Sequence, residues 1–391
     1  MEVRQIYEIV NGAAQQTLGA ETIVNEDLSN IVDIGNAIFN GNAFDAFVKS
    51  LVNHIGKVIF VNRSYTGAAP SVLMDGWEYG SILEKISSEL PVATENESWE
   101  LEDGRSYDTN VFIQPVAEAK FYNKRTTFEV RRSVTERQLK QSFSSATQLN
   151  GFLSMLANET QKTLTIATEN LVMRTINNMI AETVLSEYTN ASGYNAKTGV
   201  RAVNLLYLYN QRYSESLTAS NAITTPAFIR FAAYQMGLYS DRLTRISTLF
   251  NVGGKQRFTG KDLQKVVMLS EFSSAADIYL QSDTFHEQYT RLLNADRIPF
   301  WQGSGTSYAF SDTSAINVQP SSEATKETPK SISLSGILGV IFDRDALGVA
   351  NLDRRVTSHY VESAEFTNYW YKQDCGYFND LNENCIVFFV A

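Results

Sequence analysis

Two aspartates that follow an apolar segment form the most suggestive chemical pattern in the sequence. Asp343 and Asp345 are separated by Arg344, and two carboxylates at this spacing could bind Mg²⁺ or Mn²⁺. On an extended strand the carboxylates would share one face and Arg344 would point to the other. Arg354 and Arg355 follow closely and would compete as ion-pair partners. We therefore favour a structural charge network, and a metal-dependent enzyme, such as a transferase, remains the alternative.

Other residues that commonly carry chemistry are scattered along the chain. The histidines His54, His286 and His359 lie far apart in sequence and show no metal-binding spacing. The chain contains neither a GxSxG sequence nor a complete glycine-rich phosphate-binding loop. Cys375 and Cys385 do not form a CxxC pair, so we expect free thiols in a packed sheet. The sequence thus predicts no catalytic residue, no cofactor and no metal ligand.

The composition is that of a folded, acidic protein. The chain has 391 residues, of which 43% are hydrophobic, enough for packed cores in two or three domains. It carries 43 acidic and 33 basic side chains, a net charge of −10, whereas nucleic-acid binders usually show a basic surface. The longest apolar runs are about one strand long, so we expect no membrane-spanning segment.

The helical pattern is strongest between residues 147 and 188. No glycine or proline occurs between Gly151 and Gly193, and apolar residues recur at near-helical spacing. The middle of this segment, residues 158–163, is polar, which argues against a heptad coiled coil. We predict one long helix that lies across a sheet.

The remaining segments carry weaker patterns. The first twenty residues are interpreted as an arm, and the segment at 319–330 as a surface loop. Further expectations are two helices within 25–56, strands at 58–61 and 203–209, a helix from Thr225-Pro226 to 249, a strand at 266–272 that leads into a helix, and several strands after 336.

Residues 92–131 predict a long two-stranded projection. The pair Asp103-Gly104 is typical of a tight hairpin turn. From residue 95 to 108 there are six acidic side chains and one basic, whereas from 120 to 140 there are seven basic and two acidic. Cross-strand ion pairs in a solvated hairpin would produce the same sorting, so that interpretation stays open beside a docking role.

Six stretches, together with their order along the chain, carry a family resemblance. They are PVAEAKFYNKRTTFEVRRSVTERQLKQSF (115–143), VVMLSEF (266–272), FDRDALGV (342–349), LDRRVTSHY (352–360), FTNYWYK (366–372) and GYFNDLN (376–382). They resemble the major capsid proteins of tailed double-stranded DNA bacteriophages, which have the Hong Kong 97-type fold, and most closely those of small podophages. The resemblance covers most of the chain.

The resemblance implies an α+β fold with a long spine helix, peripheral and axial domains and a protruding extension loop. It divides the chain into an N-terminal arm and helices (1–56), a first peripheral part (57–91), the extension loop (92–131), a peripheral part with the spine helix (132–194), the axial domain (195–338) and C-terminal peripheral strands (339–391).

The resemblance also implies a function. Copies of the chain would assemble into hexamers and pentamers of an icosahedral shell around phage double-stranded DNA, which they would contact nonspecifically. Scaffolding protein, the portal and decoration proteins would be partners, no membrane would be involved, and no enzymatic activity is implied. Assembly would take place in the host bacterial cytoplasm, and the product would be the virion capsid. Residues 92–119 contain no lysine, so we expect no covalent crosslink through the extension loop.

For the contact between subunits, we expect the acidic arm of the projection to lie on a basic surface of a neighbour. The arm residues are Glu95, Glu97, Glu100, Glu102 and Asp103, the apolar anchors are Trp99 and Tyr107, and the basic candidates are Lys120, Lys124, Arg125, Arg131 and Arg132.

Rival interpretations make different predictions. An encapsulin-like nanocompartment would keep the fold and enclose an enzyme cargo instead of DNA. A metal-dependent enzyme would use Asp343 and Asp345 and would be a monomer or a small oligomer. A tail or fibre subunit would show internal repeats, which the sequence lacks.

Overall fold

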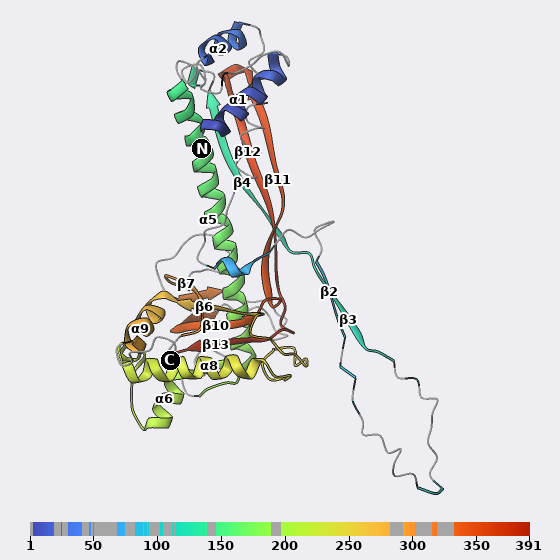
Figure 1. Ribbon diagram of the computed structural model, residues 1–391, viewed down its shortest axis with the longest axis vertical. Helices are drawn as coiled ribbons and strands as arrows, with labels where there is room; N and C mark the ends of the chain where they lie inside the picture. The colour runs from blue at the N-terminus through green and yellow to red at the C-terminus, as the bar shows by residue number, and fades with distance from the viewer. Residues whose placement is uncertain are drawn as a thin grey trace.

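The computed structural model contains two main sheets, a long helix that connects them and an outlying two-stranded ribbon (Figure 1). The residues that it describes are 3–18, 25, 30–40, 47, 50, 69–74, 83–88, 90, 91, 93, 102–104, 112, 114–135, 137, 138, 146–188, 197–281, 292–301, 315–318 and 332–391.

The described elements follow one another in this order. The first part contains α1 (Val3–Leu18), α2 (Ile31–Asn40), the 3₁₀ turn η1 (Pro70–Val72), β1 (Leu73–Met74), β2 (Leu83–Ser88), β3 (Ala117–Tyr122), β4 (Arg125–Thr135) and α5 (Ala146–Glu187). The second part contains β5 (Ala202–Asn204), α6 (Leu205–Tyr213), α7 (Ala219–Ala222), α8 (Pro226–Leu243), β6 (Gln264–Leu269), α9 (Ser270–Gln281), β7 (Asp296–Ile298), β8 (Ala315–Val318), β9 (Ile332–Ser335), β10 (Ile337–Asp343), β11 (Leu347–Val361), η5 (Glu362–Ala364), β12 (Phe366–Asn379) and β13 (Cys385–Phe389).

The five-stranded sheet forms the centre of the main core. Its strand order is β5-β13-β10-β6-β7, and β10 pairs antiparallel with both β13 and β6. Every residue of β10 and β13 is buried, because continuous apolar runs such as 385–389 can be covered on both faces. Helices α6, α8 and α9 lie around this sheet (Figure 1).

Helix α5 runs from the long sheet to the main core and contacts β4, β11, β12 and β13 (Figure 1). Its C-terminal half is buried at residues such as Leu171, Ile176 and Ile180. Buried threonines along it, Thr168 and Thr175 among them, donate hydrogen bonds to the carbonyl four residues earlier, which satisfies their hydroxyl groups. The long helix expected at 147–188 is confirmed to within one residue at each end.

The four-stranded sheet has the order β1-β11-β12-β4. Strands β11 and β12 form a long antiparallel pair joined through η5, and β12 also pairs with β4. Side chains alternate along β12: Tyr369 and Tyr371 are buried, whereas Trp370 and Lys372 are half-buried. This period of two is that of a sheet covered on one face, here by α5.

The ribbon consists of β2 and β3, which pair antiparallel from Leu83 with Tyr122 to Ser88 with Ala117. It extends away from the body, and β3 continues through residues 123–124 into β4 (Figure 1). A two-stranded projection was expected at 92–131. The paired strands begin at residue 83, and residues 125–135 belong to the four-stranded sheet.

Two sequence expectations about helices and strands are wrong, and one helix was not predicted. The N-terminal segment interpreted as an arm contains a 16-residue helix, α1, whose buried residues Val10, Ala13 and Ala14 lie at helical spacing. The strand expected at 203–209 ends at Asn204, whose side chain accepts a hydrogen bond from the Tyr207 amide and starts α6. The helix that begins at Pro226 ends at Leu243 rather than 249.

Other expectations are confirmed or lie outside the described residues. The strand-to-helix transition near residue 270 is confirmed by β6 and α9, and the C-terminal strands are confirmed as well. The first helix expected within 25–56 corresponds to α2. The second helix there, except Phe47 and Ser50, the strand at 58–61 and the loop at 319–330 lie outside the described residues. No helix among the described residues is long and apolar enough to cross a membrane.

Candidate assembly interface

The ribbon presents two chemically different faces. Leu83, Lys85 and Ser87 of β2, together with Lys120 and Tyr122 of β3, are half-buried on the side that meets the body. The intervening residues of both strands are exposed. This alternation follows from the period of two in a strand and assigns each side chain to one face.

Ion pairs attach the inner face to the body. The Lys85 ammonium lies 2.8 Å from Oδ2 of Asp380 and 2.7 Å from Oε1 of Glu383. The Lys120 ammonium lies 3.3 Å from the other oxygen, Oδ1, of Asp380. Arg257, from the segment after α8, places Nε 3.3 Å from Oε1 of Glu383. The side chains of Asp380 and Glu383 are 2% and 10% exposed, whereas those of Lys85 and Lys120 are 23% and 33% exposed, so half-buried lysines meet buried acids.

The pKa values of the cluster reflect these contacts. Burial by itself would raise the pKa of Asp380, but the Lys85 ammonium, the Asn382 amide and the Lys120 charge together hold the pKa below its ordinary value. Burial would likewise lower the pKa of Lys85, but attraction to Asp380 and hydrogen bonds to both carboxylates raise it. Both shifts favour the charged forms, so Lys85 and Asp380 are ionised at neutral pH.

Backbone hydrogen bonds hold the acidic partners in place. The Asp380 amide donates to the Ala346 carbonyl at 2.6 Å, and Oδ1 of Asp380 accepts from the Asn382 amide at 3.1 Å. The Cys385 amide donates to the Phe250 carbonyl at 2.9 Å. The turn between β12 and β13 is therefore a fixed part of the body to which the ribbon lysines bind.

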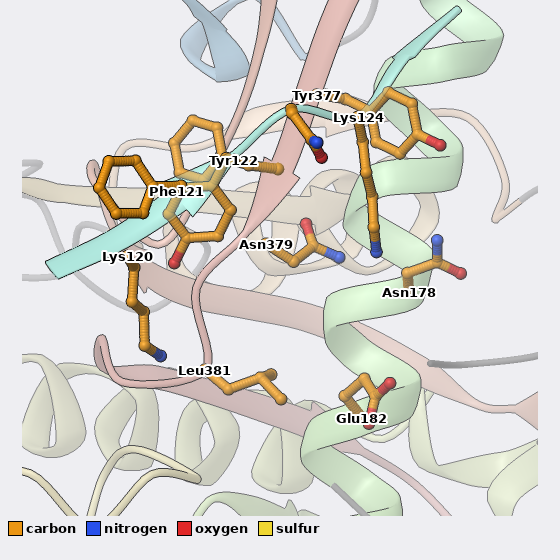
Figure 2. A pocket seen from close by; sticks show the side chains of 11 residues that line it. Lys120, Phe121, Tyr122, Lys124, Asn178, Glu182, Tyr377, Asn379 and Leu381 are labelled. Carbon is orange, nitrogen blue, oxygen red and sulfur yellow. The ribbon is translucent and has the colours of Figure 1, made fainter. Parts of the chain in front are cut away.

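Two cavities flank the ion cluster. One, of about 380 Å³, lies between β3, α5 and the end of β12 (Figure 2). Figure 2 shows Lys124 pointing from the β3–β4 junction toward Asn178 and Asn379. The other, of about 590 Å³, lies between the ribbon and residues 248–257, where Lys255 forms an ion pair with Glu118 at 3.1 Å. The ribbon therefore meets the body through polar contacts separated by open space.

The outer face of the ribbon exposes two large apolar side chains, Ile86 and Phe121, beside the polar Glu84 and Ser88. Ile86 is 68% exposed and Phe121 is 63% exposed, and the cross-strand partner of Ile86 is the exposed Ala119. Nearby, Val116 and Leu90 are also more than half exposed. Large apolar side chains gathered on one exposed face mark interaction sites in soluble proteins.

The structure places some of the predicted interface residues and not others. Of the acidic arm, Glu102 and Asp103 are exposed. The remaining arm and anchor residues lie outside the described residues; they are Glu95, Glu97, Trp99, Glu100 and Tyr107.

The basic candidates have neighbours within their own chain. Lys120 belongs to the ion cluster, Arg131 places Nε 2.6 Å from Glu129, and Arg132 places Nη2 2.6 Å from Glu159. Arg125 is exposed at the start of β4, and Lys124 is an exposed lysine beside the first cavity. Sequence reasoning missed Ile86 and Phe121, although the alternation of Ala117, Ala119 and Phe121 with charged residues could have indicated a second face on β3.

The arrangement expected for Asp343 and Asp345 is wrong. Strand β10 ends at Asp343 and the next residues form a turn, so the two carboxylates do not lie on one face of a strand. Asp343 is buried and accepts hydrogen bonds from Thr259 Oγ1 at 2.7 Å and from the Asp345 amide at 2.9 Å. Arg355 pairs with Asp353 and Asp374 instead of these residues.

Cys375 and Cys385 are buried free thiols, as expected, and burial raises the pKa of Cys385 to about 12. Among the described residues, no three His, Cys, Asp or Glu side chains are grouped so that they could hold a metal ion.

Comparisons with known proteins add a family and a fold. A family model described as Phi29-like phage major capsid protein matches residues 6–389. No curated protein matches the chain. The capsid structure of Staphylococcus phage Andhra aligns with a TM-score of 0.51 at 10% identity, over 83% of this chain and 84% of that chain. The structure of head fiber and inner core protein gp22 of native bacteriophage P68 aligns with a TM-score of 0.48 at 8% identity, over 82% and 83% of the chains.

The family match extends over nearly the whole chain, and the Andhra capsid shares its fold. The α+β, tailed-phage capsid architecture expected from the sequence is therefore confirmed. The protein is a shell-forming component of a phage capsid, and the chain belongs to the family of Phi29-like phage major capsid proteins.

Proposed function

We propose that the chain forms hexamers and pentamers of an icosahedral shell that encloses double-stranded DNA, and that its ribbon docks on an adjacent copy. The exposed apolar face of the ribbon is the observation that carries this proposal. A two-stranded ribbon alone is marginally stable in water, and burial of Ile86 and Phe121 against a neighbour would complete it.

The acidic arm adds charge complementarity to this apolar contact. Glu102 and Asp103 are exposed and can approach a basic surface of the next subunit. Lys124 and Arg125 are exposed, whereas Arg131 and Arg132 would contribute while retaining their internal partners, Glu129 and Glu159. Such charges at the edge of an interface set register and association rate more than affinity.

Other partners follow from the proposed shell. Scaffolding protein, a portal and decoration proteins would join the shell during or after assembly in the host cytoplasm. The chain carries a net charge of −10, so we expect the wall to contact DNA nonspecifically and weakly. Nucleic-acid staining of purified particles distinguishes a DNA-filled shell from an encapsulin-like compartment.

The main experiment replaces an outer-face residue. Phe121→Ser should leave the monomer folded and abolish shells in sedimentation and negative-stain electron microscopy. Ile278→Ser on α9 is the matched control, because Ile278 is 65% exposed and lies away from the ribbon. Shells of normal yield from Phe121→Ser would contradict the docking proposal.

A second experiment tests the charges. Arg131→Glu combined with Arg132→Glu should impair assembly while the monomer stays folded. Glu159→Gln removes the internal partner of Arg132 without reversing a charge, so it should assemble normally. Normal shells from the double reversal would remove Arg131 and Arg132 from the interface.

A further inference from the structure

We infer that Lys85, Lys120, Asp380 and Glu383 are positioning residues for assembly, which fix the direction of the ribbon before a neighbour binds. This inference rests on the proposed docking of the ribbon. It concerns the inner face of the ribbon, whereas docking concerns the outer face, so the two can be tested separately.

The two lysines of the ribbon, Lys85 and Lys120, are direct cross-strand partners on one face. Like charges directly opposite one another destabilise a strand pair. The Asp380 carboxylate contacts both ammonium groups, one through each oxygen. One buried acid of the body therefore removes a repulsion within the ribbon and attaches both strands to the body.

An ion cluster and an aromatic contact attach the ribbon to the body. The Lys85 ammonium contacts Asp380, Glu383 and the Asp345 carbonyl, which lies at 3.2 Å. Closer to the body, the Tyr122 ring packs at 5.2 Å from the Phe378 ring. The aromatic contact acts as a pivot, and the ion cluster two residues further along the ribbon fixes the angle about it.

Two cavities lie beside the ion cluster. The two cavities leave open space on either side of the ion pairs, so the Tyr122–Phe378 contact is the apolar packing described between the ribbon strands and the body near the cluster. The Lys255–Glu118 pair beyond the cluster is exposed at 32% and 42%, and exposed pairs contribute little. The direction of the ribbon therefore depends mainly on the buried cluster.

The consequence for assembly is preorganisation. A ribbon held in one direction loses less conformational freedom when it docks than one that samples many directions. Without the cluster, the apolar face would still exist but would meet a neighbour in the required orientation less often. Assembly should then become slower and require a higher protein concentration.

The test measures hydrogen exchange in the unassembled full-length chain. In Asp380→Asn and in Lys85→Met, amides of residues 83–88 and 117–122 should exchange roughly 10- to 100-fold faster, since loss of one partner of a buried pair is costly. Amides of β10 and β13 should not change, which shows that the body remains folded. Lys85→Arg keeps the charge and should restore most of the protection. Lys255→Met is the control and should change exchange less than about fivefold.

The assembly assay completes the test. Both charge-removing variants should show a delayed onset of shell formation in light scattering, and Lys85→Arg should restore it. Unchanged exchange in both variants would overturn the inference. Faster exchange with assembly at the wild-type rate would also overturn it, while docking would stand. Normal assembly of Phe121→Ser would instead show that the docking proposal had failed.

Discussion

Strands β10 and β13 and strands β2 and β3 are both antiparallel pairs, but only the first is completed within the chain. All residues of β10 and β13 are buried. In the ribbon, one face binds the body through ion pairs and the other exposes Ile86 and Phe121. Folding therefore buries the side chains of the first pair and leaves Ile86 and Phe121 in solvent, which is the basis of the docking proposal.

The first prediction compares a phenylalanine from each pair. Phe388 in β13 has no exposed surface, and Phe388→Ala should lower the free energy of unfolding by about 3–5 kcal/mol through lost burial and a cavity. Phe121→Ala, at 63% exposure, should lower it by less than about 0.5 kcal/mol. Denaturant unfolding of the unassembled chain measures both values. Similar losses of unfolding free energy for the two variants would contradict the difference in burial between the two strand pairs.

The second prediction tests a polar anchor in the body. The Glu187 carboxylate, at the end of α5, accepts hydrogen bonds from the amides of Val200, Arg201 and Ala202 at 2.9–3.0 Å. Glu187→Ala leaves these donors without their acceptor and should cost about 2–4 kcal/mol of unfolding free energy. Glu187→Gln keeps one acceptor oxygen and should cost less. Equal costs would show that neither the side-chain volume nor the oxygen that Gln retains contributes, and that the carboxylate charge and its second oxygen carry the effect.

The contrast between the buried strand pair and the ribbon also explains which elements could be predicted from the sequence. The long helix and the fully buried strands were predictable, because local periodicity and apolar runs follow from burial within one chain. The projection was also predictable from its turn pair and charge sorting. Helix α1 was missed because the first twenty residues are largely polar and were interpreted as an arm, although the buried residues Val10, Ala13 and Ala14 lie at helical spacing.

Contacts between distant segments could not be predicted. The pairing of Lys85 with Asp380 spans nearly 300 residues, and nothing in local sequence assigns Asp380 rather than another acid to it. The same holds for Asp343, whose hydrogen bond from Thr259 depends on how β10 meets the segment after α8. Charge counts along the chain indicated a basic surface but could not show which bases already have internal partners.

The third prediction uses pH to measure the ion cluster. Asp380 faces Lys85 from β2 and Lys120 from β3, and its neighbour Glu383 also faces Arg257. Because the pKa of Asp380 is lowered on folding, its stabilising effect is present above the unfolded pKa, about 3.9, and is lost as pH falls through the folded value. Lys85 has a raised pKa, so its effect persists up to about pH 10.

We expect the stability difference between wild type and Asp380→Asn to be constant over a wide pH range. The stability of wild type minus that of Asp380→Asn, about 1–3 kcal/mol, should stay constant between about pH 5 and 9 and shrink toward pH 3. Thermal unfolding across this range measures the difference. A difference that falls between pH 7 and 5 would show that a group other than Asp380 controls the cluster.

The smallest effect is expected from an ion pair of similar length that is more exposed to solvent. Arg297 and Asp277 lie 2.7 Å apart, against 2.8 Å for Lys85 and Asp380, but they are 50% and 42% exposed. Asp277→Asn should therefore cost less than about 0.5 kcal/mol, and 1 M salt should abolish that cost, because exposed charges are screened whereas buried ones are screened much less. Denaturant unfolding of Asp277→Asn and Asp380→Asn at low and high salt provides the measurement. If the unfolding free energies of both variants respond to salt alike, burial does not determine the strength of the ion pairs that attach the ribbon to the body.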